Sequence, residues 1–196
     1  MISVDLKILR KQLRHQRRTV SPFIQKQSQQ QVLNQLIRLK QFQHSKKIGI
    51  YLHAFGEIQT KQIIEYCFTH HKDVYLPMIC NMNQQLHWVK ITQKQYRNNQ
   101  FSHHPFGMKE PVAGRGLHVS TLDFLIMPLL ACDIYGTRIG MGGGFYDKTL
   151  AGAPTKPFRL GIAHDFQLIQ QRLTREPWDQ PLDALLTPSR YLYFKR

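Results

Sequence analysis

The most informative stretch of the chain lies between residues 133 and 147 and reads Asp133-Ile-Tyr-Gly136-Thr-Arg138-Ile-Gly140-Met-Gly142-Gly143-Gly144-Phe-Tyr146-Asp147. Five glycines fall within nine residues, after the nearly continuous apolar run 122–127 and before a predicted helix at 145–151. Such a run is typical of a central parallel strand that is covered on both faces. Glycines let phosphate oxygens approach the backbone, and consecutive N–H groups ahead of a helix suit an anion. The stretch therefore predicts a strand–loop–helix unit that binds phosphate.

Charged side chains stand near both ends of this loop. Arg138 suits phosphate because a guanidinium can bind two oxygens at once. Asp147 lies a few residues into the predicted helix, where a carboxylate can hold Mg²⁺ that bridges phosphates. The loop has no Gly-Lys-Ser/Thr, and it lacks the spacing and the later acidic residue of a dinucleotide fingerprint. A tight structural turn would also use glycines, so the two charges carry much of the prediction.

Strands and helices alternate along the rest of the chain. The patterns predict helices at 4–20 (with Ser3 as N-cap), at 25–43 after a Ser21-Pro22 start, and at 60–71 with Thr60 as cap. They predict strands at 47–52, 74–78, 86–92, 122–127 and 159–163, and one or two closing strands within 182–194. The polar segment 93–118 is predicted to be a long loop. This order predicts one domain over residues 1–196, an α/β/α three-layer sandwich around a mainly parallel, mixed sheet, with the basic helices in 4–43 packed on it.

Length and composition exclude several classes of protein. With 196 residues, 42% of them apolar, the chain can bury a full core. Its longest apolar run, residues 124–132, is too short to cross a bilayer. The N-terminus has no apolar segment typical of a secretory signal. Three widely spaced cysteines form neither a disulfide framework nor a zinc pattern. We therefore expect a cytoplasmic protein without a membrane partner.

Positive charge is concentrated near the N-terminus. Lys and Arg total 27 against 12 Asp and Glu, and residues 1–47 hold eleven of the basic residues and one acid. On the first predicted helix, an apolar stripe comprises Leu6, Leu9, Leu13 and Val20. A neighbouring basic stripe comprises Lys7, Arg10, Arg14 and Arg17. A basic stripe without acids favours an anionic partner over a merely solvated face, but charge alone does not choose between nucleic acid, membranes and small anions.

From Gly136 onward the loop resembles the G-x-R-x-G-x-G-G-G-[FY]-Y-D signature of the 5-formyltetrahydrofolate cyclo-ligase family, also called 5,10-methenyltetrahydrofolate synthetases. Phe145 stands where Tyr is more frequent in that signature. Further stretches that resemble the family are Leu9-Arg10 with Arg14 and Arg17-Arg18, Tyr51-Leu52, Glu57–Thr60, Phe106–Pro111 and Trp178–Asp183. The resemblance therefore covers nearly the whole chain.

The resemblance implies an ATP-dependent ligase that converts 5-formyltetrahydrofolate to 5,10-methenyltetrahydrofolate and releases ADP and phosphate. In such a reaction the formyl oxygen is phosphorylated and N10 of the folate then closes the ring. Positioning and charge neutralisation dominate phosphoryl transfer, which explains why no Ser-His-Asp or Cys-His constellation is needed. The implied ligands are 5-formyltetrahydrofolate, ATP and Mg²⁺. We expect a monomer that binds no nucleic acid.

The resemblance and the loop chemistry together assign residues to roles. Arg138 and Tyr146 are predicted to be catalytic. The predicted ATP-binding residues are Lys7, Arg10, Arg138, Gly140, Gly142, Gly143, Gly144 and Tyr146. The predicted folate-binding residues are Leu52, Glu57, Met141 and Phe145, and the predicted Mg²⁺ ligands are Asp147 and Asp179.

Four of these residues have a structural alternative to their predicted role. Arg138 could form a surface ion pair, and Tyr146 could be a core aromatic. Asp179 could cap a helix or a turn, and Glu57 could cap the helix that Thr60 opens. For Glu57, the cap alternative predicts a slightly lower thermal stability on substitution without a loss of folate binding.

Two other functions compete with the ligase. A basic nucleic-acid-binding module would explain the charge of residues 1–47. It would not explain residues 136–147, and the chain has no aromatic ladder for stacking bases. Another α/β enzyme that binds a phosphate-bearing ligand, such as a sugar phosphate or coenzyme A, would share the architecture, because fold does not determine function.

Overall fold

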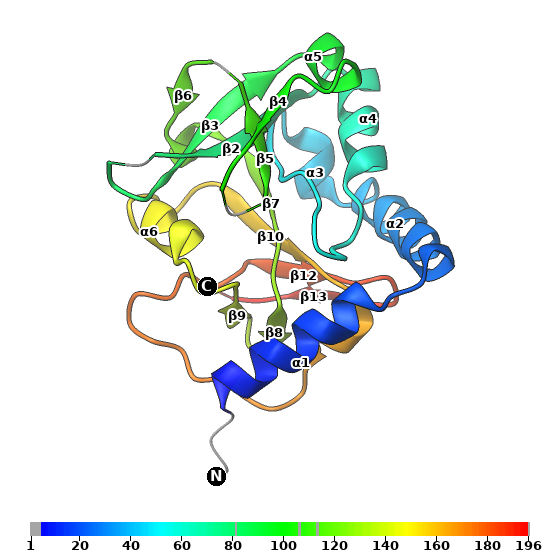
Figure 1. Ribbon diagram of the computed structural model, residues 1–196, viewed down its shortest axis with the longest axis vertical. Helices are drawn as coiled ribbons and strands as arrows, with labels where there is room; N and C mark the ends of the chain where they lie inside the picture. The colour runs from blue at the N-terminus through cyan, green and yellow to red at the C-terminus, as the bar shows by residue number, and fades with distance from the viewer. Residues whose placement is uncertain (1–4, 81, 106, 113, 196) are drawn as a thin grey trace.

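An eight-stranded mixed sheet runs through the computed structural model, which describes residues 5–80, 82–105, 107–112 and 114–195 (Figure 1). The strand order is β13–β12–β10–β7–β1–β2–β3–β6. In chain order these strands are β1 (Lys47–Gly49), β2 (Asp73–Ile79), β3 (Leu86–Ile91), β6 (Gly116–Leu117), β7 (Phe124–Met127), β10 (Phe158–Ile162), β12 (Ala184–Leu186) and β13 (Tyr191–Tyr193). The five strands from β12 to β2 are parallel, and the outer strands are antiparallel. The predicted mainly parallel, mixed sheet is confirmed.

Helices cover both faces of this sheet. One face carries α2 (Pro22–Leu36), α3 (Lys40–His44), α4 (Lys61–Thr69) and α5 (Gln93–Arg97). Buried Leu36, Phe42 and Ile63 from these helices pack with Phe124 of β7. The other face carries the 3₁₀ turn η1 (Val119–Thr121) and α6 (Phe145–Ala151), whose Leu150 is buried there. All four residues of β7 are buried, as expected for a central strand between two helical layers.

Helix α1 (Leu6–Arg18) lies over a smaller sheet at the lower end of the molecule in Figure 1. That sheet comprises β8 (Ala131–Asp133), β9 (Arg138–Ile139) and β11 (Leu168–Ile169), and the 3₁₀ turn η2 (Asp165–Gln167) precedes β11. Leu13 is buried against Ala131 and Ile139. Ser3, the predicted N-cap, lies outside the described residues, and Asp5 caps the helix by accepting hydrogen bonds from the N–H groups of residues 7 and 8. Helix α1 therefore packs on the small sheet, and α2 packs on the main one.

The second predicted helix is divided in two. Ser21 caps α2 and Pro22 begins it, as predicted, but α2 ends at Leu36 and α3 begins at Lys40. The break lets the chain turn so that Phe42 packs against Phe124, with their ring centroids 5.4 Å apart. A straight helix over residues 25–43 is therefore wrong.

The prediction that segment 93–118 is a long loop is wrong. It contains α5, the paired strands β4 (Phe101–His103) and β5 (Lys109–Pro111), and β6 at the sheet edge. A capping box of Thr92 and Gln95 begins α5. The strands have only two or three residues each, too few to show an alternating pattern in the sequence. Pairing with distant partners decides their conformation.

Two further points concern the chain as a whole. None of the helices in the described part of the chain is long and apolar enough to cross a membrane. The organisation of residues 1–196 as one domain stays a prediction, although strands from residue 47 to residue 193 share one sheet.

Candidate functional site

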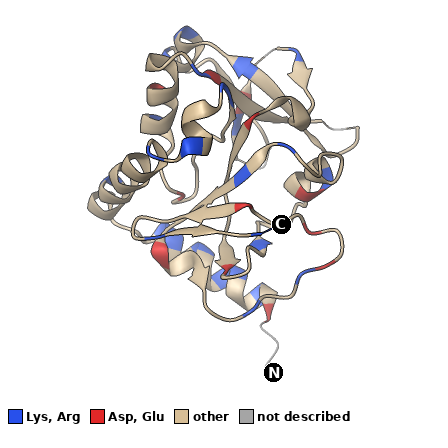
Figure 2. Cartoon of the chain, turned by 180° about the vertical axis from the view of Figure 1, so that it is seen from behind, with Lys and Arg blue, Asp and Glu red and all other residues tan. Residues whose placement is uncertain are grey.

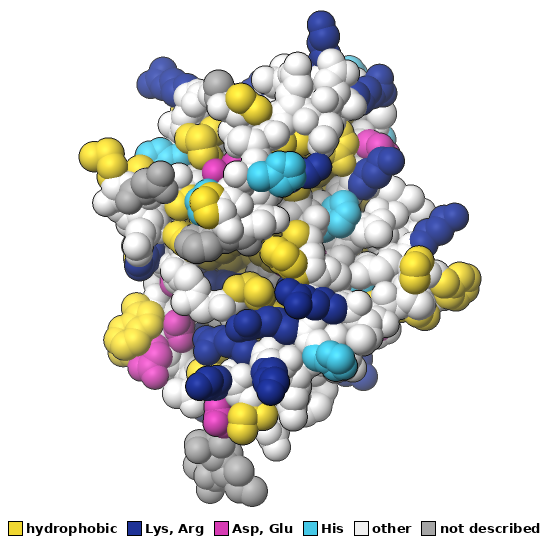
Figure 3. Space-filling view, viewed as in Figure 1, with side chains coloured by type: hydrophobic (Ala, Val, Ile, Leu, Met, Phe, Trp, Pro, Cys, Tyr) yellow, Lys and Arg dark blue, Asp and Glu magenta, His cyan; other side chains and the backbone are white. Residues whose placement is uncertain are grey.

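A pocket of about 1160 Å³ opens where several parallel strands end. Its walls come from α1, the loop after β1, the end of β2, β5, the loop after β7, the glycine loop 140–144 with α6, and the segment 174–179. Figure 3 shows Lys and Arg side chains gathered over α1, next to apolar side chains, and Figure 2 shows basic positions recurring along this helix. Pockets for single small ligands are usually about 300–1,000 Å³. The volume of this pocket exceeds that range.

The glycine loop supplies backbone donors to one end of the pocket. Gly142 and Gly144 have φ angles of +108° and +66°, a region that side-chain-bearing residues rarely adopt. A Cβ on Gly142 would meet nothing within 4 Å. Within the described chain, the N–H groups of Gly142, Gly143 and Gly144 donate no hydrogen bond to the protein. Because α6 has only seven residues, these free donors, rather than the helix dipole, make the loop suitable for an anion.

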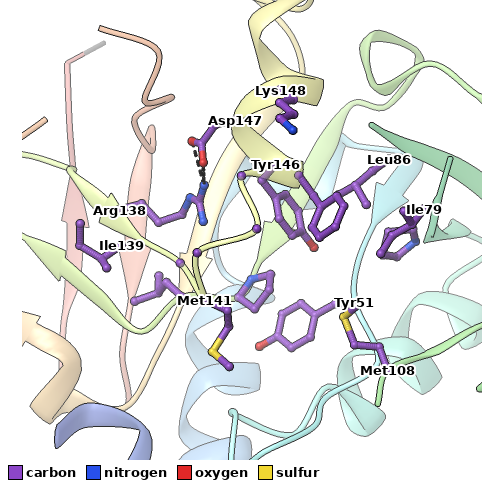
Figure 4. A pocket seen from close by; sticks show the side chains of 18 of the residues that line it. Tyr51, Ile79, Leu86, Met108, Arg138, Ile139, Met141, Tyr146, Asp147 and Lys148 are labelled. Carbon is purple, nitrogen blue, oxygen red and sulfur yellow. Dashed lines mark hydrogen bonds and ion pairs between the residues drawn. The ribbon is translucent and has the colours of Figure 1, made fainter. Parts of the chain in front are cut away.

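Arg138 and Asp147 form an ion pair beside the loop, in which one guanidinium nitrogen contacts both carboxylate oxygens (Figure 4). The Arg138 Nη2 atom lies 2.9 and 2.8 Å from the Asp147 Oδ1 and Oδ2 atoms. The side chain of Arg138 is 4% exposed and that of Asp147 is 20% exposed, so the ion pair does not lie on the surface, as the structural alternative had it. Asp147 Oδ1 also accepts a hydrogen bond from the N–H of Gln180, at 3.0 Å. The guanidinium lies 5.6 Å from the ring centroid of Tyr146, within range of a cation–π contact. The pair thus fixes the position of Arg138 at the pocket wall.

The predicted magnesium ligands are partly engaged within the protein. Asp147 is paired with Arg138, and Asp179 Oδ2 accepts a hydrogen bond from the N–H of Glu176, at 2.9 Å, as in the turn-cap alternative. Among the described residues, no group of three or more His, Cys, Asp or Glu side chains could hold a metal. Mg²⁺ is usually bound through one or two carboxylates together with substrate phosphates. Since both carboxylates line the pocket, they fit an ion that enters with the phosphates, not a preformed cage.

Glu57 supplies a buried carboxylate to the other end of the pocket. Its Oε2 atom accepts a hydrogen bond from the N–H of Ala54 at 2.9 Å, and Oε1 lies 3.4 Å from Nη1 of Arg17. Burial raises the pKa of Glu57, although Arg17 and the Ala54 N–H act in the opposite direction. The alternative that Glu57 caps α4 is wrong, because its carboxylate bonds to Ala54 of its own loop and to Arg17 of α1. Thr60 occupies the predicted N-cap position of α4, but its side chain makes no cap hydrogen bond, since its hydroxyl donates to the Tyr51 carbonyl.

Arg17 was not assigned to the site by sequence reasoning, but it lines the pocket and is 1% exposed. Its Nε donates to the Phe55 carbonyl at 3.0 Å, and Nη1 donates to the Leu129 carbonyl at 3.2 Å. A signal for this burial exists in the sequence. Arg17 follows Leu13 by four residues, so it continues the apolar stripe of α1 as well as the basic one.

Arg10, but not Lys7, reaches the pocket. Arg10 Nε donates to the Gly140 carbonyl at 3.2 Å, which ties α1 to the glycine loop. Lys7 is exposed and is not among the residues that line the pocket. A role for Lys7 in ATP binding stays a prediction.

Apolar and aromatic side chains form the wall between the two ends. Leu52, Met141 and Phe145 line the pocket, as do three residues that sequence reasoning missed, Ile79, Leu86 and Met108. Tyr51, also missed, has a buried hydroxyl without a hydrogen-bond partner in the described chain. Burial raises the pKa of Tyr51 and of Tyr146, so both hydroxyls stay protonated. Figure 4 shows both rings at the pocket.

The sequence profile of the 5-formyltetrahydrofolate cyclo-ligase family matches residues 3–188. The chain is 35% identical to the 5-formyltetrahydrofolate cyclo-ligase of Escherichia coli K12 over 184 residues, which cover 91% of this chain and 97% of that protein. It is 33% identical to the Haemophilus influenzae 5-formyltetrahydrofolate cyclo-ligase over 181 residues, covering 91% and 95%. The NMR structure of Aquifex aeolicus 5,10-methenyltetrahydrofolate synthetase has a similar fold, with a TM-score of 0.83, 27% identity, and coverage of 98% and 94%. Each similarity extends over nearly the whole chain.

Proposed function

The chain belongs to the 5-formyltetrahydrofolate cyclo-ligase family, and we propose that the pocket beside α1 binds both substrates of the family's reaction. The enzyme converts 5-formyltetrahydrofolate to 5,10-methenyltetrahydrofolate in a reaction that uses ATP. The residues that perform it, the metal and the order of steps belong to our proposal.

The observation that carries this proposal is the division of one pocket into two chemically different ends. One end offers the N–H groups of Gly142–Gly144 and the cation Arg138, which suit the phosphates of ATP. The other end offers the carboxylate of Glu57, which suits the neighbouring N–H donors of a pterin ring. Apolar residues between the two ends suit the rest of the folate. A formyl group held between the two ends of the pocket would face the terminal phosphate of ATP.

The proposed reaction begins when the formyl oxygen attacks the γ-phosphorus of ATP and ADP leaves. N10 of the folate then attacks the activated formyl carbon, N10 loses its proton, and phosphate leaves as the ring closes. Arg138 neutralises charge on the transferred phosphoryl group, and the ring of Tyr146 makes a cation–π contact with the Arg138 guanidinium. Glu57 holds the pterin, so that the chain contributes mainly positioning and charge.

Asp147 and Asp179 would hold Mg²⁺ together with the phosphates. When bound, the ion would neutralise negative charge on the phosphates. Asp147 has a second task, because its carboxylate also orients the Arg138 guanidinium.

The basic helix α1 serves small anions rather than nucleic acid in this proposal. Two of its arginines, Arg10 and Arg17, are bonded to loops of the pocket instead of facing solvent. We extend the proposal to a cytoplasmic monomer without a nucleic-acid partner. Titration with an oligonucleotide at physiological salt tests this, since binding tighter than the non-specific range of roughly 10⁻⁴–10⁻⁶ M would contradict it.

The decisive experiment follows methenyltetrahydrofolate by its absorbance, starting from 5-formyltetrahydrofolate with and without ATP. We expect product only when ATP is present, with ADP formed in equal amount. Absence of product when both substrates are present would refute the function. Product without ADP formation would refute the phosphorylation step.

A further inference from the structure

Arg17 brings a buried positive charge to the wall between the two ends of the pocket. Besides its bonds to two backbone carbonyls, its Nη1 lies 3.4 Å from Glu57 Oε1 and its Nη2 lies 3.8 Å from the Met141 sulfur. Met141 belongs to the glycine loop, and Glu57 belongs to the loop after β1. One side chain of α1 therefore contacts both substrate ends.

Stability alone does not explain a charge at this position. Arg17 continues the stripe formed by Leu6, Leu9 and Leu13, and an apolar residue would complete that stripe. Burying a guanidinium is costly, and replacement of buried ion pairs by apolar residues is often neutral or stabilising. Gly56 allows a close approach of the two backbones here, because a Cβ on this residue would lie 2.2 Å from the Arg17 carbonyl oxygen. The backbone thus brings the Glu57 loop close to α1 at the point where Arg17 meets it.

We propose that Arg17 is a positioning residue for folate recognition, which keeps the Glu57 carboxylate charged and oriented and links it to the glycine loop through Met141. The proposal rests on the proposed function, in which Glu57 binds the pterin. A charged carboxylate accepts two N–H bonds, whereas a protonated one presents an O–H against the same donors. The side chain that keeps Glu57 charged therefore controls folate affinity.

The other groups around Glu57 do not supply this charge. The pKa values of Tyr51 and Tyr146 are raised by burial, so both hydroxyls are neutral. Burial lowers the pKa of the nearby His164, which keeps its ring neutral at pH 7. Burial also raises the pKa of Glu57 itself, and Arg17 is the cation that opposes this rise.

The first test is Arg17→Met, with equilibrium binding of 5-formyltetrahydrofolate measured between pH 5 and pH 9. At pH 7 we expect binding to weaken about tenfold or more, the loss typical of a hydrogen bond to a charged group. The midpoint at which acid weakens binding should move to higher pH, because Glu57 loses its cation. ATP affinity should change by less than about threefold, well below the tenfold that 1.4 kcal/mol represents. Wild-type folate affinity with a wild-type midpoint would overturn the proposal.

Two further variants separate this role from a structural one. Arg18→Met removes the neighbouring arginine, which is exposed and does not line the pocket, and should leave folate binding unchanged. Glu57→Gln removes the titrating group, so folate binding should lose this acid midpoint, and adding Arg17→Met should weaken binding little further. A pH dependence that Arg17→Met still shifts in that background would contradict action through Glu57.

Arg17→Lys keeps the proposal testable if the Met variant does not fold. Lysine retains the charge but cannot donate to four partners in the same plane. We expect weaker folate binding with a midpoint near that of the wild type, and unchanged affinity in this variant would overturn the positioning role. Failure of the wild-type protein to bind 5-formyltetrahydrofolate would instead refute the proposed function.

Discussion

The ion pair between Arg138 and Asp147 is where removal of one charge should harm the reaction most. Asp147→Asn keeps the size of the side chain but leaves one oxygen acceptor for three N–H contacts, two from Arg138 Nη2 and one from the Gln180 N–H. The new amide NH₂ would also face donors. The Arg138 guanidinium loses the carboxylate that fixes its orientation beside the proposed phosphate site.

The size of the effect follows from these contacts. A hydrogen bond to a charged group contributes about 1.5–3 kcal/mol. Because Asp147 is 20% exposed, solvent screens part of it, and we expect a loss of about 1–2 kcal/mol of unfolding free energy. For a chain of this size that lowers the melting temperature by roughly 2–8 °C. Turnover should fall about 100-fold or more, as expected when a preorganised charge at a developing anion is displaced.

Melting temperature and ATP-dependent turnover, measured on the same preparation, test both parts. Asp123→Asn is the matched control, since Asp123 Oδ2 accepts the N–H groups of Lys46 and Lys47 at 2.9 and 2.8 Å and does not line the pocket. It should lose comparable stability but keep turnover near the wild-type rate. Arg138→Ala should lose turnover as Asp147→Asn does. Near wild-type turnover in both pocket variants would refute the reasoning.

Three more predictions test the loop, the thiols and the metal. Gly142→Ala should weaken ATP binding in calorimetry, because alanine at φ +108° strains the backbone by about 1–3 kcal/mol. Gly152→Ala is the control, since φ is −81° there and ATP should bind normally. Equal ATP affinities of the two variants would contradict the role of the loop. Half-buried Cys80 should react with a thiol reagent before Cys67 and Cys132, because the latter two are buried. Burial raises the pKa of Cys67 to about 12 and also raises the pKa of Cys132. Rapid labelling of all three thiols in the native protein would contradict this packing. Chelation of Mg²⁺ should weaken ATP binding about tenfold, because two carboxylates at the pocket need a cation between them and the phosphates, and unchanged affinity would exclude the proposed metal.

Local signals were sufficient for several elements. The bounds of α6, 145–151, and the start of α2 at Ser21-Pro22 were predictable, because caps and glycines act over a few residues. The central strand β7 was predictable from its continuous apolar run, since burial on both faces leaves no place for polar residues. The glycine loop and its two charges were also visible, although the sequence did not show that Arg138 and Asp147 bind each other.

What the sequence by itself determined is therefore the fold class, the glycine loop and the family resemblance, each of which depends on near neighbours or on a contiguous motif. Only the tertiary structure decided that Arg17 meets Glu57 across 40 positions of sequence and that Arg10 rather than Lys7 reaches the glycine loop. The short strands within 101–117 were likewise decided only by the tertiary structure, because their partner strands supply the hydrogen bonds that define them. Helical periodicity gives the face on which a side chain lies, but a buried charge is placed by whichever distant loop supplies its acceptors, and that is a property of the packed chain.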